Sequence, residues 1–328
     1  MMRLPKAVGM IVFCVSILTM FPFSGVFCAE TFPDRPVTVI VNFGAGGPTD
    51  VAIRLMTPGA EKKLGQPIII SNKPGAGGVL GVAELAKAKP DGYTIGASNT
   101  GFQITTPMLQ KVPYDPHKDF DNICSFAANQ FAIYASTKGP YKTLKDVVEA
   151  ARKNPGMVNY GATSIGVALG MKYLESKENL KMKMVQFQSG PEMAAAVVGG
   201  HLDLMISTDL KTALEWLNKG DIKALAVATD PRSPDLPNVP TFRELGYDID
   251  LTMVINLAAP AGVPKDRLKV LTEAFRAGAS DPDAMAKMKA MYMWCPFLDG
   301  EQTTKLFQQR EREWKPFLEA LAAQMSAK

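Results

Sequence analysis

The sequence has few of the residues on which enzymes and metal sites usually depend. It contains two histidines and four cysteines in 328 residues. His117 lies in a proline-flanked connection and His201 follows a Gly-Gly pair, so neither has a nearby partner for a catalytic triad or a metal site. Cys124 and Cys295 belong to no nucleophile motif. These absences argue against an enzyme and predict that no metal or other cofactor is bound.

The excess of positive charge is also small. The formal net charge is +4, from 36 Lys and Arg against 32 Asp and Glu. Arg3 and Lys6 belong to a segment that we expect to be removed, and subtracting them leaves +2. Nucleic-acid-binding proteins usually present a strongly basic face, so no nucleic-acid partner is predicted. Internal repeats and low-complexity segments are absent, which excludes solenoids and linker arrays.

The first 29 residues have the layout of a secretory signal peptide. Arg3 and Lys6 precede an apolar stretch over Val8–Phe21, and polar residues follow. A membrane-spanning helix needs roughly 20 uninterrupted apolar residues, whereas Pro22 and Gly25 interrupt this run. We therefore expect a cleavable signal over residues 1–29 and a periplasmic mature protein.

Cysteines bear on both the cleavage site and the redox state. Cleavage after Cys28 and cleavage after Ala29 both remain open, and Phe27 is a poor substitute for the small residue that precedes a lipidated cysteine. In an oxidising compartment, Cys124 and Cys295 could form a disulfide. Two buried, unbridged thiols are the alternative.

Short apolar runs alternate with longer helical patterns after residue 35. The predicted strands are Val37–Asn42, Pro67–Ile70, Thr94–Ala97, Phe131–Ala135, Val158–Tyr160, Met184–Phe187, Leu202–Ile206, Ala224–Ala228 and Thr252–Ala258. The predicted helices are Val51–Leu64, Val79–Ala88, Leu144–Lys153, Gly166–Ser176, Glu192–Val198, Lys211–Lys219, Lys265–Ala277, Pro282–Met291 and Gln302–Ala323. This alternation indicates an α/β fold with a largely parallel sheet covered on both faces. The charged run at residues 310–313 predicts a solvated helix face.

A glycine-rich loop between the first strand and the first helix is the clearest local signal. It consists of Phe43, Gly44, Ala45, Gly46, Gly47, Pro48, Thr49 and Asp50. Glycines allow close backbone approach, and the free N–H groups at a helix start attract an anion. The loop lacks the Gly-Lys-Ser/Thr of a phosphate loop and the third glycine of a dinucleotide fingerprint. It is either a small-anion cradle or a tight strand-to-helix turn.

Three more loops of small polar residues follow predicted strands. They comprise Ser98, Asn99 and Thr100, then Ala162, Thr163, Ser164, Ile165 and Gly166, then Gln188 and Ser189. Ligands of α/β sheets bind beyond the carboxyl ends of the strands, so as a set these loops favour a cleft lined with hydroxyls and amides. Asp209 is either a carboxylate of this cleft or an exposed loop acid.

Short motifs along nearly the whole mature chain resemble one protein family. They are Phe32-Pro33-Asp34-Arg35-Pro36-Val37, Leu64-Gly65-Gln66-Pro67, Asn72-Lys73-Pro74-Gly75-Ala76-Gly77-Gly78, Pro90-Asp91-Gly92-Tyr93-Thr94, Pro113-Tyr114-Asp115-Pro116, Asn159-Tyr160-Gly161 and Ala259-Pro260-Ala261-Gly262. In this order they resemble the Bug or TctC family, the extracytoplasmic solute receptors of tripartite tricarboxylate transporters.

The resemblance implies a type II-like periplasmic binding protein with a ligand cleft between two α/β domains. On this chain, one domain would comprise residues 30–126 plus 252–328, and the other residues 127–251. The resemblance also implies that the glycine loop and the loop after Tyr160 face each other and hold a carboxylate through amides, hydroxyls and water. The membrane components of a tripartite tricarboxylate transporter would be the partners.

Departures from the family pattern bear on the ligand. Ile165, Val167 and Ala168 replace part of a polar run, Gln188 stands where lysine is frequent, and Val254-Ile255 replaces a common aromatic pair. These departures predict a ligand with one firmly held carboxylate and an apolar or aromatic body, rather than a tricarboxylate. A ligand sensor for a membrane signalling protein and an exported α/β enzyme are the alternatives.

Overall fold

Two β-sheets organise the part of the chain that the computed structural model describes, which is residues 32–163, 166–187, 189–207, 210–293 and 296–326. The first sheet has the order β11-β4-β10-β3-β1-β2 and the second the order β7-β6-β8-β5-β9. The first is built from β1 (Val37–Val41), β2 (Ile68–Asn72), β3 (Thr94–Asn99), β4 (Phe120–Asn129), β10 (Met253–Pro260) and β11 (Leu298–Asp299). The second is built from β5 (Ala132–Ser136), β6 (Asn159–Ala162), β7 (Lys183–Gln186), β8 (Leu204–Ser207) and β9 (Ile222–Val227).

The sheets are mixed rather than largely parallel, so that expectation was wrong. β1 pairs in parallel with β2 and β3, and β6 pairs in parallel with β7 and β8. β10 runs antiparallel to both β3 and β4, and β5 runs antiparallel to β8 and β9. The parallel pairs come from strand-helix-strand units, whereas the antiparallel strands flank the two passages between the sheets.

Helices follow most of the strands and cover the sheets. They are α1 (Pro48–Leu64), α2 (Val79–Ala86), α3 (Thr106–Leu109), α4 (Leu144–Lys153), α5 (Leu169–Lys177), α6 (Gly190–Val198), α7 (Leu210–Asn218), α8 (Lys265–Ala279), α9 (Pro282–Ala290) and α10 (Gly300–Ser326), with the short turns η1 (Ala76–Gly78) and η2 (Gly101–Thr105). α1 begins with Pro48 and ends with Leu64, and it is capped by Gly65, whose φ of 70° is left-handed. α4 begins with a capping box between Thr143 and Asp146.

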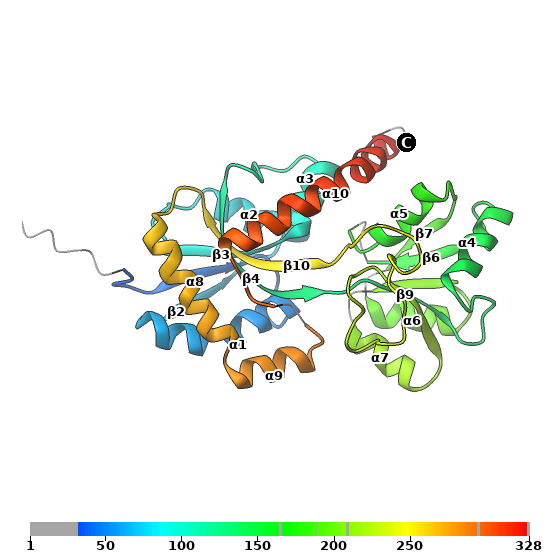
Figure 1. Cartoon of the computed structure of the whole chain (residues 1–328), viewed down its shortest axis with the longest axis horizontal. Coiled ribbons are helices and arrows are strands. Elements are labelled where there is room, and N and C mark those ends of the chain that lie inside the picture. Colours follow the sequence, from blue (N-terminus) through cyan, green and yellow to red (C-terminus); the bar gives the residue numbers. More distant parts are fainter. Residues whose placement is uncertain (1–31, 164–165, 188, 208–209, 294–295, 327–328) are drawn as a thin grey trace, which may run out of the picture. The chain divides into compact units, whose positions relative to one another are not determined.

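The chain passes between the sheets through β4–β5 and β9–β10. Asn129, the last residue of β4, pairs with Met253, the first residue of β10. Figure 1 shows these two strands running side by side. All strands before residue 130 and after residue 252 belong to the first sheet, and those between belong to the second.

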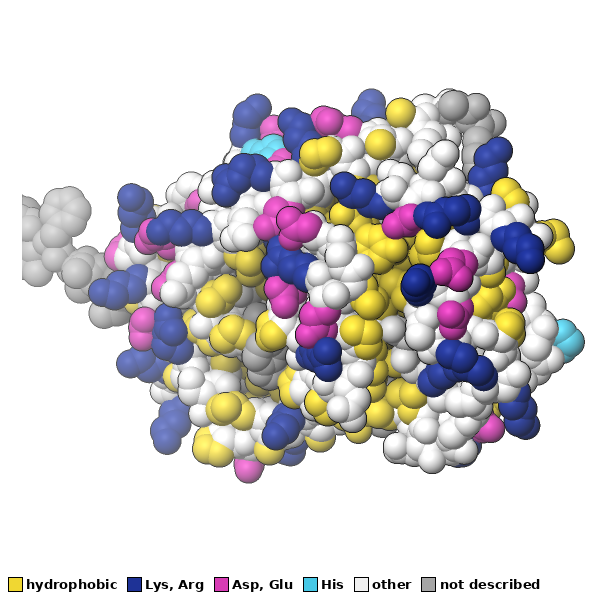
Figure 2. Space-filling model, turned by 45° about the vertical axis from the view of Figure 1, so that its right-hand side comes forward, with side chains coloured by type: hydrophobic (Ala, Val, Ile, Leu, Met, Phe, Trp, Pro, Cys, Tyr) yellow, Lys and Arg dark blue, Asp and Glu magenta, His cyan; other side chains and the backbone are white. Residues whose placement is uncertain are grey.

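The C-terminal helix α10 contributes to the core of the second sheet. Trp314, Phe317 and Leu318 belong to the same buried cluster as Tyr160 of β6. The ring centroids of Phe317 and Tyr173 lie 5.4 Å apart in an edge-to-face arrangement. Figure 2 shows hydrophobic side chains gathered near the middle of one face, with charged side chains of both signs spread around them.

The charged run of α10 is not wholly solvated, which corrects the expectation for residues 310–313. Arg310 is 9% exposed and its guanidinium pairs with Asp250, which is 1% exposed. Trp314 Nε1 donates a hydrogen bond of 2.9 Å to the carbonyl of Asp250. The second passage between the sheets is therefore tied to α10 just before β10 begins.

Candidate functional site

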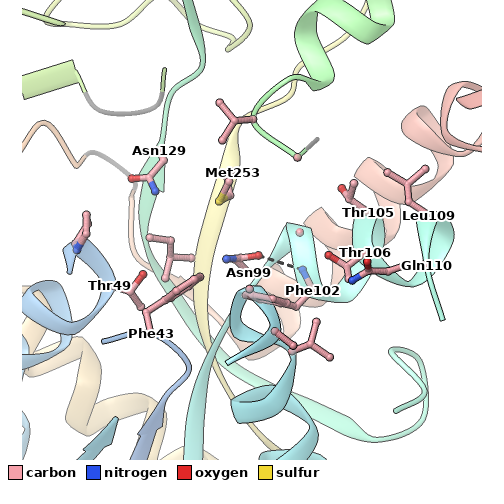
Figure 3. Close-up of a pocket in the computed structure, with 18 of the residues that line it drawn as sticks. Phe43, Thr49, Asn99, Phe102, Thr105, Thr106, Leu109, Gln110, Asn129 and Met253 are labelled. Carbon is pink, nitrogen blue, oxygen red and sulfur yellow. Dashed lines mark hydrogen bonds between the residues drawn. The ribbon is translucent and has the colours of Figure 1, made fainter. Parts of the chain in front are cut away.

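A cavity of about 600 Å³ lies beyond the carboxyl ends of β1 and β3. Its size is within the range of small-molecule pockets, roughly 300–1,000 Å³. The described residues that line it are Phe43, Pro48, Thr49, Ala76, Gly77, Val79, Asn99, Gly101, Phe102, Thr105, Thr106, Leu109, Gln110, Asn129, Gly166, Val167, Met253, Ile255 and Met325. None of these described lining residues is charged. Figure 3 shows the polar side chains at separate points around this lining.

The glycine loop forms one wall of the cavity, and Asp50 fixes its shape. The Asp50 side chain is 1% exposed. Its Oδ2 accepts hydrogen bonds from the Gly46 amide at 2.8 Å and from Arg54 Nε at 2.9 Å, and its Oδ1 accepts one from Asn72 at 2.9 Å. Asn72 also donates to the carbonyl of Phe43 at 3.0 Å. The carboxylate thus joins both ends of the loop to β2.

Electrostatics favours the ionised form of Asp50. Burial acts to raise its pKa, but hydrogen bonds from Arg54, the Gly46 amide and Asn72 outweigh burial, and the net pKa lies below the ordinary value. The same carboxylate raises the pKa of Arg54. Because the two charges offset each other locally, the start of α1 retains its capacity to attract an anion.

Free backbone donors remain at the start of α1. The Gly46 amide is used by Asp50, and the Gly47 amide donates to Gly44 at 3.3 Å. The amides of Ala45, Thr49 and Asp50 have no acceptor among the described residues. A helix start with unpaired N–H groups is a general anion-binding arrangement. The loop therefore has the chemistry of a carboxylate cradle.

A second wall comes from β3 and the turn that follows it. Asn99 Oδ1 accepts a hydrogen bond from the Phe102 amide at 3.1 Å, and the Tyr114 hydroxyl donates to the Phe102 carbonyl at 3.0 Å. The segment Gly101–Thr105 is a π-helical turn that leads directly into α3. Such turns are rare and are frequently found at functional sites.

The two passages between the sheets supply the rest of the lining. The paired residues Asn129 and Met253 both face the cavity, as does Ile255. Gly166 and Val167, which follow β6 of the second sheet, and Met325 of α10 also line the cavity. Segments attached to both sheets therefore line one cavity.

Some of the predicted site residues line this cavity and others do not. Phe43, Asn99 and Gly166 do. The adjoining loop contains Gly44, Ala45, Gly46, Gly47 and Asp50, which do not line the cavity themselves. Two further residues are buried next to Asn99 in the sequence, Ser98 and Thr100. Three more are described but do not line the cavity: Ala162, Thr163 and Ser189. Ser164, Ile165, Gln188 and Asp209 lie outside the described residues. Their roles in binding stay predictions.

Sequence reasoning missed several lining residues. Ala76 and Gly77 belong to a glycine-rich run after β2, and the logic applied to the first glycine loop could have found them. Thr105, Thr106 and Gln110 follow the predicted Ser98–Thr100 loop closely, but no periodicity marks a π-helical turn. Met325 reaches the cavity only through the length of α10, so no local signal could have revealed it.

Other candidate chemistry lies away from the cavity. Cys124 is a free, fully buried thiol in β4, and burial raises its pKa well above the ordinary value; its predicted alternative partner, Cys295, lies outside the described residues. Among the described residues, no group of three or more His, Cys, Asp or Glu side chains could hold a metal ion. None of the described helices combines the length and apolarity needed to cross a bilayer.

Comparisons with known proteins agree with this geometry. The chain is similar to a UPF0065 protein of Cupriavidus necator (29% identity, covering 89% of each chain) and to one of Bordetella pertussis (33% identity, covering 77% of this chain and 79% of the other). Among solved structures, it is similar to a TctC solute-binding protein from Polaromonas (TM-score 0.75, 26% identity, covering 88% and 99%) and to MatC from Rhodopseudomonas palustris with bound malate (TM-score 0.71, 28% identity, covering 88% and 100%).

The fold of these structures is that of periplasmic solute-binding proteins, and the family consists of receptors rather than enzymes. The model of the tripartite tricarboxylate transporter family receptor, TctC, matches residues 52–323. That match covers most of the chain, which therefore belongs to the TctC receptor family.

Proposed function

We propose that this protein is a periplasmic receptor that captures a small acid with one carboxylate and an apolar or aromatic body, and delivers it to a tripartite tricarboxylate-type membrane transporter. The observation that carries the proposal is the lining of the cavity. A wall with free amide donors at the start of α1 adjoins a surface that includes Phe43, Phe102, Val167 and Met253, with no charged side chain among the described lining residues.

Amides and the helix dipole can stabilise one carboxylate without a cationic side chain. A second or third carboxylate in this cavity would lose its hydration without gaining an ionic partner, which is costly. The family's citrate-like ligands are therefore disfavoured here. The malate bound by MatC belongs to that relative, and it supports only the general class of small carboxylates.

The proposal includes the organisation of the chain. Residues 1–29 act as a cleavable signal. One domain comprises residues 30–126 together with 252–328, and the other comprises residues 127–251. Closure of these domains holds the ligand and presents a surface to the membrane partner. It also includes the absence of enzymatic turnover. The strands change sheet between β4 and β5 and again between β9 and β10, which supports two domains with crossings near residues 130 and 252.

A thermal-shift screen of the chain from Glu30 tests the ligand class. Dicarboxylates, tricarboxylates, aromatic acids and amino acids are compared, because a ligand at 100 times its Kd stabilises by about 2.7 kcal/mol. Aromatic or aliphatic monoacids are expected to raise the melting temperature. A shift with citrate that exceeds the shift with every monoacid contradicts the proposal. Recovery of the transporter's membrane components with the ligand-loaded protein tests delivery.

Two matched glycine variants test the anion cradle. Gly46 and Gly156 both have positive φ, 82° and 79°, and in both an added Cβ meets nothing within 4 Å. Gly46→Ala and Gly156→Ala should therefore carry the same backbone strain, roughly 1 kcal/mol. Only Gly46→Ala should weaken acid binding in a calorimetric titration. Equal affinities in the two variants would remove the glycine loop from the site.

A further inference from the structure

Uncharged polar side chains gather on the wall of the cavity that lies away from the glycine loop. In Figure 3, Phe43 and Thr49 lie on one side, and Thr105, Thr106 and Gln110 lie on the other. The latter three come from the π-helical turn η2, from α3 and from the residue that follows α3. The cavity thus has two polar ends.

The polar groups of the far end are not used by the protein itself. Within the described ranges, the side chains of Thr105, Thr106 and Gln110 take part in no hydrogen bond. Thr105 is only 4% exposed, yet it lines the cavity. Because these hydroxyl and amide groups have no protein partner among the described residues, they are free to bond to a ligand group that enters the cavity.

The local structure holds this end in place. The Asn99 side chain accepts from the Phe102 amide, and the Tyr114 hydroxyl donates to the Phe102 carbonyl, so both backbone groups of Phe102 in η2 are engaged from outside the turn. Leu109 and Met325 also line the cavity and supply apolar surface. The arrangement is suited to a methylene chain that ends in a polar group.

We propose that Thr105, Thr106 and Gln110 form a second polar subsite, which binds an uncharged hydroxyl or carboxamide at the end of the ligand opposite its carboxylate. This inference rests on the proposed function, since it assumes that the carboxylate occupies the glycine loop. Hydroxyl and amide side chains can both donate and accept. With no cationic side chain among the described lining residues, a second carboxylate is bound less well than a neutral polar group.

Four acids of equal chain length test the subsite by calorimetric titration: hexanoate, ω-hydroxyhexanoate, the monoamide of adipate, and adipate. The hydroxy acid and the monoamide should bind about two- to tenfold more tightly than hexanoate, which is the effect of one net hydrogen bond. Adipate should bind more weakly than its monoamide. Hexanoate binding as tightly as the hydroxy acid overturns the inference and leaves the proposed function standing. Adipate binding most tightly overturns the inference and also the one-carboxylate ligand of the proposed function.

Two variants locate the preference in these residues. Thr106→Val and Gln110→Met keep side-chain volume and remove the polar groups, and they should reduce the preference for the monoamide over hexanoate while hexanoate affinity is retained. Gln309→Met, an exposed position on α10, is the matched control and should keep the preference. An unchanged preference in both cavity variants overturns the inference. No binding of any of the four acids by the wild type overturns the inference, and the proposed function falls with it only if the aromatic acids of the thermal-shift screen fail as well.

Discussion

Replacing Arg310 with methionine should destabilise the protein strongly, because it leaves Asp250 buried without its charge partner. The two side chains are 10% and 2% exposed. Asp250 Oδ1 also accepts a hydrogen bond from the Thr252 amide at 2.8 Å, and Arg310 contacts Glu313 at 3.2 Å. Removing one partner of a buried ion pair typically costs about 3–5 kcal/mol. For a chain of this size, roughly 2 °C per kcal/mol gives a fall in melting temperature of about 6–10 °C.

Thermal unfolding followed by circular dichroism measures this loss. Arg312→Met is the matched control, because Arg312 lies on the same helix and is exposed, and its substitution should change stability by less than about 0.5 kcal/mol. Adding Asp250→Asn to Arg310→Met should recover part of the loss, since the uncompensated charge is then removed. The buried ion pair would contribute little to stability if the melting temperatures of Arg310→Met and Arg312→Met differed by less than 2 °C, which corresponds to roughly 1 kcal/mol. That result would refute the reasoning.

Three further predictions concern the glycine loop, the cavity wall and the buried thiol. Asp50→Asn should lower the free energy of unfolding by about 1–3 kcal/mol at neutral pH. Because the pKa of Asp50 is lowered in the folded protein, its contribution to stability is complete above the ordinary pKa of 3.8 and is lost as the pH falls through the folded pKa. The melting temperatures of variant and wild type should therefore converge in acid. Gly78→Ala places a Cβ 2.5 Å from the Phe102 ring at a φ of 101°; it should displace that ring and weaken acid binding about tenfold or more in titrations, and unchanged affinity counts against the assigned wall. In a Cys295→Ser background, Cys124 should react with a thiol reagent only after denaturation, and rapid labelling of the native protein contradicts its burial.

The β/α units and the glycine loop could be predicted from sequence because their signals are local. In Val37–Val41 the four apolar residues are buried and only Thr38 is partly exposed, and small residues followed by Pro48 mark the turn into α1. β4 was missed because Asp121, Asn122 and Ser125 interrupt its apolar pattern. In the fold, Asn122 is satisfied by long-range partners, since it accepts hydrogen bonds from Gln103 and Asn256 and donates one to Thr304.

Long-range contacts explain the other errors. Arg310 lies in a run of charges that looks like an exposed helix face, and its partner is 60 residues away in sequence. The far wall of the cavity depends on a π-helical turn and on Met325, and neither follows from amphipathic periodicity. The sequence pattern therefore predicted the glycine-loop wall of the cavity, whereas the opposite wall required the three-dimensional arrangement.

The composition of the cavity bears on how a ligand could drive closure. A ligand shifts a conformational equilibrium only through its difference in affinity between the two states, and a change from 1:99 to 99:1 needs about 5.5 kcal/mol. The glycine loop lies wholly on the first sheet, so contacts there are the same whether or not the domains close. Gly166 and Val167 follow β6 of the second sheet, and Asn129 and Met253 lie where the passages between the sheets pair. Under the proposed function, the free energy of closure thus comes from whatever part of the ligand contacts these residues, and the amides at the start of α1 provide anchorage.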